Sequence, residues 1–221
     1  LPVGYESLVR WSRGTYGVAA SEFIEMAEST GLIHDLGAHV RSELIHAAVE
    51  RAQDGAGSGS ADPVWFSNVS VQELRMPGIV ESIVDGLDAA EFPRSQFVVE
   101  VRCDQHGDVG PALASLDALH EHGIGLALDD LGAGGASLEL LRSIPLTWAK
   151  IAPSFTASML DDPHAAGILE SLLSLADRMG VKAVAKGVET EPQREALVRL
   201  GAPFGQGHLF APAAPLASLA L

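Results

Sequence analysis

The chain is poor in cysteine, in basic side chains and in long hydrophobic runs, and each shortage excludes a class of protein. Cys103 is the only cysteine among 221 residues, which excludes an intramolecular disulfide framework and a thiolate metal cluster and suits the cytoplasm, the location that we expect. The 14 basic side chains against 29 acidic ones give a formal net charge of -15, which argues against a nucleic-acid partner and an anionic membrane surface. No apolar run is long enough to span a bilayer and no signal peptide is visible, so we expect no direct membrane insertion.

What the chain does contain suits one large domain over residues 1–221. A composition that is 47% apolar, with 23 glycines, fits a buried core with many tight turns. The chain starts at Leu1 almost inside a predicted strand. We therefore expect that upstream sequence precedes Leu1.

Predicted strands and helices alternate almost throughout the chain. The strands cover residues 4–11, 65–70, 96–102, 123–130, 148–153 and 181–188, and the helices cover residues 21–30, 34–53, 71–87, 110–122, 137–143, 161–179 and 191–200. This order predicts an α/β fold, a TIM-like (β/α)8 barrel, in which functional side chains come from the carboxyl ends of several strands at once. A doubly wound open sheet is the alternative, but it concentrates its ligand at one switch point.

Polar side chains gather at the carboxyl ends of these strands, dispersed over the whole chain as a barrel requires. They are Glu6, Asn68, Glu100, Asp129, Asp130, Lys150 and Lys186. Carboxylate and amide oxygens are hard ligands for Mg²⁺, Ca²⁺ or Mn²⁺, whereas a protonated lysine cannot be a ligand. The sequence therefore predicts a metal–phosphate site that Lys186 has altered.

The order and spacing of several short motifs resemble the EAL domain, the barrel that hydrolyses cyclic di-GMP to linear pGpG. The matching segments are GYESLVRW with Glu6-Ser7-Leu8 at the naming tripeptide, SEFIEMAESTGLIHDLG, SNVS, VEVRC, LDDLGAGGASLELL, AKIAPSF, AVAKGVET and GAPFGQGHLF. Single matches such as SNVS are weak, but eight in order over nearly the whole chain are specific. The resemblance implies a domain of cyclic di-GMP signalling. It also implies a first strand upstream of Leu1, and further domains of a larger signalling protein or a separate protein as partners.

The resemblance also implies a role for individual residues. By that likeness, the first metal site, for magnesium or manganese, is formed by Glu6, Asn68, Glu100 and Asp129. Asp130 matches a ligand of a second metal, and Lys150 matches a lysine that contacts the attacking water. Glu189 matches the second glutamate of the E-G-V-E motif. Gln206 matches the glutamine of Q-G-Y, and Arg10 matches an arginine that pairs with a ligand phosphate.

The chain departs from the family pattern at positions that matter for catalysis. Ala152 replaces the aspartate of K-I-D, Lys186 replaces the first glutamate of E-G-V-E, and Arg102-Cys103 replace the last two residues of E-x-T-E. We therefore expect the second metal site to be lost and hydrolysis to be absent or vestigial. The loop 131–136 is also altered, which speaks against the family's mode of pairing and leaves a homodimer open.

Three functions stay open at this point. In the first, the chain binds cyclic di-GMP without cutting it, and Lys186 takes the place of an ion. In the second, it is an interaction module that binds no nucleotide. In the third, it retains residual phosphodiesterase activity. Residue spacing excludes two other functions, a phosphate-binding glycine loop of a nucleotide-cofactor oxidoreductase and a zinc site. The segment GAGGAS (132–137) lacks the last glycine of G-x-G-x-x-G, and His120 and His122 lie two residues apart on a predicted helix, which points them away from a common metal.

Overall fold

The structure is a computed structural model that describes residues 2–13, 16–54, 63–102, 110–133 and 141–215. The chain divides into two compact units. The first contains residues 1–100 and 109–125, and the second contains residues 101–108 and 126–220. Each unit is described by itself below.

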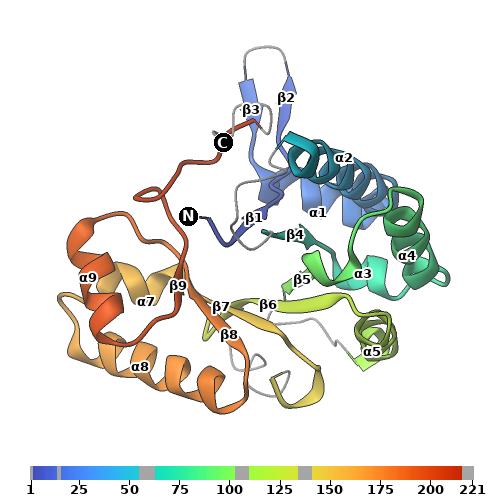
Figure 1. The fold of residues 1–221 in the computed structure, drawn as a ribbon. Coiled ribbons are helices and arrows are strands. Elements are labelled where there is room, and N and C mark those ends of the chain that lie inside the picture. Colours follow the sequence, from blue (N-terminus) through green and yellow to red (C-terminus); the bar gives the residue numbers. More distant parts are fainter. Residues whose placement is uncertain (1, 14–15, 55–62, 103–109, 134–140, 216–221) are drawn as a thin grey trace. The chain divides into compact units, whose positions relative to one another are not determined.

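Three parallel strands form the sheet of the first unit, in the order β1 (Gly4–Glu6), β4 (Val64–Asn68) and β5 (Phe97–Arg102, whose last two residues fall in the second unit) (Figure 1). Glu6 is paired with Phe66 in the register, and Asn68 with Glu100. The helices are α1 (Ala20–Thr30), α2 (Ile33–Asp54), α3 (Val71–Leu74), α4 (Ile79–Ala89) and α5 (Leu113–Glu121), with 3₁₀ turns η1 (Arg94–Gln96) and η2 (Gly110–Ala112).

Two predicted elements of this unit are wrong in extent. The strand expected over 4–11 ends at Glu6, and a short antiparallel hairpin of β2 (Trp11–Arg13) and β3 (Tyr16–Val18) follows. The helix expected over 71–87 is two helices, α3 and α4. Pro77 and Gly78 explain the break, because a proline ring disfavours helical geometry in the residue before it and Gly78 has a φ of 84°.

Four parallel strands form the sheet of the second unit, in the order β6 (Gly125–Leu131, whose first residue falls in the first unit), β7 (Trp148–Ile151), β8 (Lys182–Ala185) and β9 (Phe204–Gly205). Its helices are α7 (Pro153–Ser158), α8 (Pro163–Arg178) and α9 (Glu191–Arg199), and α8 packs on β7 and β8. The sequence prediction missed α7, which has only six residues. The helix expected over 137–143 falls largely outside the described residues.

The helix starts follow from local chemistry. Asp162 caps α8 by accepting a hydrogen bond from the His164 amide at 2.8 Å. Thr190 begins α9 with a reciprocal capping box to Gln193, which confirms the predicted N-cap.

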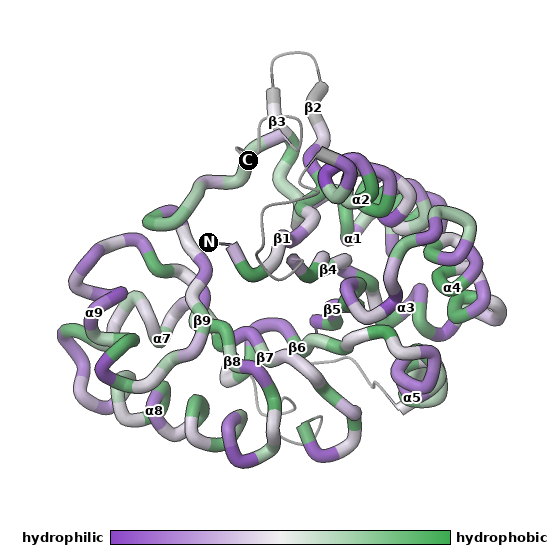
Figure 2. Tube along the Cα trace, viewed as in Figure 1, coloured by the Kyte–Doolittle hydropathy of each residue, from purple (hydrophilic) through white to green (hydrophobic). Residues whose placement is uncertain are grey.

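Buried apolar strands form the core of each unit. All four residues of β7 are buried, and so are the first five of β5, as expected for parallel strands covered on both faces. Along α2 and α8 hydrophilic and hydrophobic residues alternate (Figure 2), which is the pattern of a helix with one face on a sheet and one in water. Among the described residues, no helix is both long and apolar enough to cross a membrane.

Candidate functional site

In the first unit, three of the predicted metal ligands lie on neighbouring strands. Glu6 ends β1, Asn68 ends β4, and Glu100 is paired with Asn68 in the parallel register. The Asn68 side-chain amide donates to Glu6 Oε1 and to the Ser7 carbonyl, both at 3.2 Å. Glu100 is fully buried. Two carboxylates and an amide have the donor chemistry that Mg²⁺ or Mn²⁺ prefers.

Arg10 belongs to the same unit but lies after the end of β1. It is exposed, and its Nη1 donates to the carbonyl of its neighbour Val9 at 3.1 Å. Its predicted contact with a ligand phosphate stays a prediction.

In the second unit, Asp129 and Asp130 lie near the carboxyl end of β6. Successive side chains of a regular strand point to opposite faces, so two adjacent aspartates would not normally reach one partner. Here the pairing of β6 with β7 shifts its register between Leu128 and Leu131, and Asp130 has a φ of 51°, in the left-handed region that aspartate tolerates better than most residues. The irregularity lets both carboxylates meet the same cation.

That cation is the ammonium group of Lys186. Its Nζ donates to Asp129 Oδ1 at 2.5 Å and to Asp130 Oδ1 at 2.9 Å. Burial lowers the pKa of Lys186, but its charge and hydrogen-bond interactions with the two aspartates outweigh that effect and raise the pKa above the ordinary lysine value. Lys186 is therefore a fixed positive charge at neutral pH, neither a metal ligand nor a general base.

Backbone contacts fix the position from which Lys186 extends. Its amide donates to the Ile151 carbonyl at 3.2 Å, and the amide of Val188 donates to the Gln206 carbonyl at 3.0 Å. Between them Gly187 has a φ of 74°, and a Cβ there would lie 2.7 Å from Pro153 Cβ. The turn after β8 is thus tied to β7 on one side and to the segment after β9 on the other.

A second basic side chain, Arg102 at the end of β5, completes the cluster within the same unit. Its Nη2 lies 2.6 Å from Asp130 Oδ2, so each oxygen of Asp130 has its own cationic partner. The sequence reasoning noted Arg102 only as a departure from the family pattern. Its place two residues after Glu100, on the same face of one strand, is the pattern that could have indicated it.

The other predicted residues of this unit lie at or after strand ends. Lys150 is buried in β7 with 2% exposure, and Ala152, equally buried, follows that strand without a carboxylate to offer. Gln206 is half-buried after β9. Glu189 is exposed, and its amide donates to Gln193 Oε1 at 2.8 Å at the start of α9.

The residues present do not fit a divalent cation at Asp130. Its two oxygens already face Lys186 and Arg102, and Ala152 stands where the family pattern has a further carboxylate. Within the described part of the chain, no three His, Cys, Asp or Glu side chains form a group that could hold a metal ion. The donors Glu6, Asn68 and Glu100 do fit the chemistry of one ion, and the addition of Asp129 to them stays a prediction.

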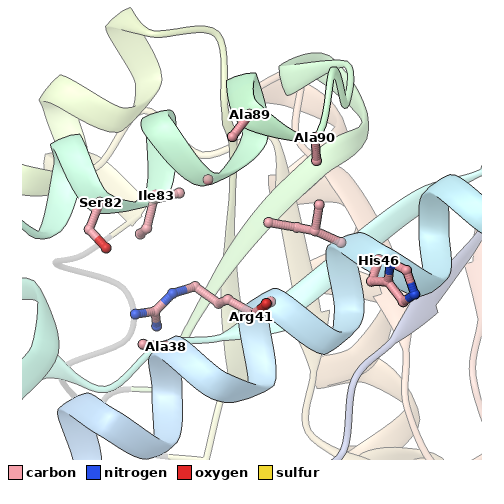
Figure 3. Close-up of a pocket in the computed structure, with 10 residues that line it drawn as sticks. Ala38, Arg41, His46, Ser82, Ile83, Ala89 and Ala90 are labelled. Carbon is pink, nitrogen blue, oxygen red and sulfur yellow. The ribbon is translucent and has the colours of Figure 1, made fainter.

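A hollow of about 390 Å³ lies between α2 and α4 in the first unit (Figure 3). Small side chains such as Ala38, Ser82 and Ala90 line much of it, and the guanidinium of Arg41 is already paired with Glu73 at 2.6 Å. None of the predicted site residues lines this hollow.

Comparison with solved structures gives the class of fold. The chain resembles the structure of the PaMucR phosphodiesterase in complex with c-di-GMP, with a TM-score of 0.88 and 31% identity over 99% of this chain and 87% of that one. The predicted TIM-like barrel of the EAL type is thereby confirmed. The EAL domain family matches residues 2–213, and the chain belongs to this family.

Curated relatives agree with this assignment. The chain is 32% identical over 209 residues to the bifunctional diguanylate cyclase/cyclic di-GMP phosphodiesterase MucR of Pseudomonas aeruginosa, covering 94% of this chain and 30% of MucR. It is 30% identical over 214 residues to the cyclic di-GMP phosphodiesterase RocR of the same organism, covering 95% of this chain and 53% of RocR. The chain thus spans between about a third and a half of the length of these relatives.

Proposed function

We propose that this EAL domain no longer hydrolyses cyclic di-GMP and acts as a cyclic di-GMP-binding or regulatory module. The observation that carries the proposal is the contact of Lys186 with both Asp129 and Asp130. In the family pattern a glutamate occupies the position of Lys186, so the substitution exchanges a negative charge for a positive one beside two carboxylates.

The loss of hydrolysis follows from what these side chains can do. In two-metal phosphodiester cleavage, the bound ions supply a hydroxide nucleophile and neutralise the charge that develops on the phosphate. Ala152 provides no oxygen ligand, and a lysine whose pKa is raised cannot accept a proton from water at neutral pH. Groups that act as a unit in catalysis typically cost many decades of rate when they are removed together.

The same substitution favours binding of an anion. A lysine ammonium has three N–H donors, of which Asp129 and Asp130 accept two, and we expect the third to serve a ligand phosphate. Gln206 and Arg10 are the further residues that we expect to contact the dinucleotide. The domain would act in the cytoplasm with other domains or a protein partner, and a homodimer is compatible with that role.

Calorimetric titration with cyclic di-GMP, once with Mg²⁺ and once with EDTA, tests the proposal when the mixture is afterwards analysed for linear product. Binding without product is the expected result, and binding that persists in EDTA would show that it needs no metal ion, as expected if Lys186 takes the place of one. Linear product would refute the loss of hydrolysis. No heat in either buffer would instead favour an interaction module that binds no nucleotide.

Two variants sharpen this test. Lys186→Gln should weaken binding, whereas Arg194→Gln, which removes an exposed arginine paired with Glu191 on α9, should not change it. Lys186→Glu combined with Ala152→Asp should restore metal-dependent hydrolysis if the changes at these two positions alone account for its loss.

A further inference from the structure

We propose that Arg102 and Lys186 act together as built-in counter-ions that close Asp130 to divalent cations, and that Arg102 positions Asp130. A consequence is that replacing Lys186 alone does not fully reopen Asp130 to a divalent ion. Nothing in the family resemblance assigns a role to an arginine at position 102.

The geometry places one cation on each oxygen of Asp130. Lys186 Nζ lies 2.9 Å from Oδ1, and Arg102 Nη2 lies 2.6 Å from Oδ2. Lys186 also reaches Asp129 Oδ1 at 2.5 Å. A hard divalent ion would need the lone pairs of these same oxygens and would have to approach two positive charges at close range.

The charges of Lys186 and Arg102 together equal the charge of one divalent ion. Two carboxylates and two monovalent cations sum to zero, which is the sum that two carboxylates and one divalent ion would also give. The aspartates and their two cations therefore carry no net negative charge that would draw a divalent ion to Asp130.

Exposure separates the roles of the two cations. The side chain of Lys186 is 19% exposed and contacts both aspartates, whereas that of Arg102 is 66% exposed and contacts Asp130 alone. Asp130 itself is 14% exposed and has the left-handed backbone conformation noted above. Arg102 thus pairs with Oδ2 of Asp130, and Lys186 pairs with Oδ1 of the same carboxylate. The pair of Arg102 with Asp130 does not depend on Lys186, so it should persist when Lys186 is replaced.

Titration with Mn²⁺, followed by the electron paramagnetic resonance of the free ion, tests the inference without nucleotide. The proteins are the unaltered chain, Lys186→Gln, Arg102→Gln and the double variant. Each of the four is prepared once with Asp130 intact and once with Asp130→Asn. We expect no Asp130-dependent Mn²⁺ affinity in the unaltered chain, a small gain in either single variant, and a further gain of about tenfold in the double variant that Asp130→Asn abolishes.

Conservative replacement distinguishes charge from structure. Arg102→Lys keeps the positive charge, so in the Lys186→Gln background it should keep Mn²⁺ affinity low, unlike Arg102→Gln. Circular dichroism without metal identifies any variant that fails to fold, and Lys186→Met or Arg102→Met then replaces it in the series.

Three outcomes would overturn the inference. They are an Asp130-dependent Mn²⁺ site in the unaltered chain, a full gain from Lys186→Gln alone, and no gain in the double variant. The inference rests on the proposed loss of the second metal site. Because the titration contains no cyclic di-GMP, a failure to bind nucleotide and a failure of Arg102 to exclude metal give separate results.

Discussion

Each unit of the chain contains a cluster of ion-paired side chains, and the two clusters differ in how deeply they are buried. In the first unit, Arg41 and Glu73 pair at 2.6 Å with side-chain exposures of 7% and 2%. Glu73 also accepts a hydrogen bond from the Ser70 amide in the capping box of α3, and Gly37 of α2 lies against its carboxylate. The cluster of the second unit has two cations and two anions at strand ends, and Arg102 on its outer side is mostly exposed.

The difference suggests two uses of an ion pair. A fully buried pair supports the fold, whereas a partly exposed cluster at strand ends is the one that we propose takes the place of a metal ion. Removing one partner of a buried pair leaves an uncompensated charge in the interior, so the Arg41–Glu73 pair is a fixed part of the packing. The cluster of Lys186 lies where a barrel places its functional side chains, and its cations pair with carboxylates that the sequence predicted as metal ligands. The first pair should therefore dominate stability, and the second should dominate metal and ligand chemistry.

The largest expected effect is that of Glu73→Gln. The amide preserves the size of the side chain and part of the cap but leaves the Arg41 guanidinium buried without its counter-ion, which should lower the free energy of unfolding by about 3–5 kcal/mol. Urea denaturation measures the change. Glu191→Gln, at an exposed pair with Arg194, is the matched control and should have little effect. A loss no larger than that of the control would show that the buried pair is dispensable.

Close packing at the same pair should make Gly37→Ala destabilising. A Cβ at Gly37 would overlap the Glu73 carboxylate, and relief of such overpacking typically costs about 1–3 kcal/mol. The control is Gly86→Ala in α4, where a Cβ would meet only Ile45 Cδ1 at 3.9 Å and should stabilise by about 0.5–1 kcal/mol through helix propensity. Thermal melts of both variants should therefore shift in opposite directions, and a shift in the same direction would contradict the structure.

Lys186→Gln should cost less stability and respond to salt. The two aspartates would lose their shared cation while Arg102 still neutralises one of them, so we expect a loss of about 1–3 kcal/mol. Added salt should reduce this loss, because the partly exposed carboxylates are screened, and should change the loss in Glu73→Gln much less. Denaturation at low and high ionic strength compares the two, and equal salt responses would remove the distinction between the clusters.

The contribution of Lys186 should also depend on pH in the alkaline range. Because the pKa of Lys186 is raised in the folded chain, its stabilisation is fully present below the unfolded lysine pKa of about 10.4 and is lost as the pH rises through the higher folded value. The stability difference between the unaltered chain and Lys186→Gln should therefore be constant around neutrality and shrink only above that pH. A difference that shrinks between neutral pH and the lysine range would show that another group is responsible.

The smallest effect on stability is expected from Arg102→Gln. Its side chain is 66% exposed, and exposed ion pairs contribute roughly 0–1 kcal/mol. A thermal melt should barely move, although the same substitution should increase Mn²⁺ affinity when Lys186 is also replaced. A stability loss as large as that of Lys186→Gln would mean that Arg102 supports the fold itself.

The regular parts of the fold follow closely from sequence pattern. The predicted strands at 65–70, 96–102 and 148–153 match β4, β5 and β7 to within a few residues, since continuous apolar runs between polar ends suit buried parallel strands. The short elements were missed or merged. The six-residue α7 has no room for a helical period, and the split between α3 and α4 rests on Pro77 and Gly78, which the helical pattern of 71–87 concealed.

The candidate site, too, was partly predictable from the sequence pattern and partly visible only in the structure. Strand-end positions indicated which side chains would carry the chemistry, and the spacing of motifs indicated the family. The pattern could not show that adjacent aspartates converge on one ammonium, because a regular strand would separate them. That convergence depends on the register shift of β6 and on the backbone of Asp130.

The sequence by itself determined the family, the order of strands and helices, and the loss of a carboxylate at Ala152 and of a glutamate at Lys186, because these are written in residue identity and spacing. Only the tertiary structure decided which carboxylates contact Lys186 and that Arg102 pairs with one of the same carboxylates. The physical reason is that an ion pair forms over a few ångströms in space, and residues 102, 130 and 186 reach that distance only when their strands lie in register.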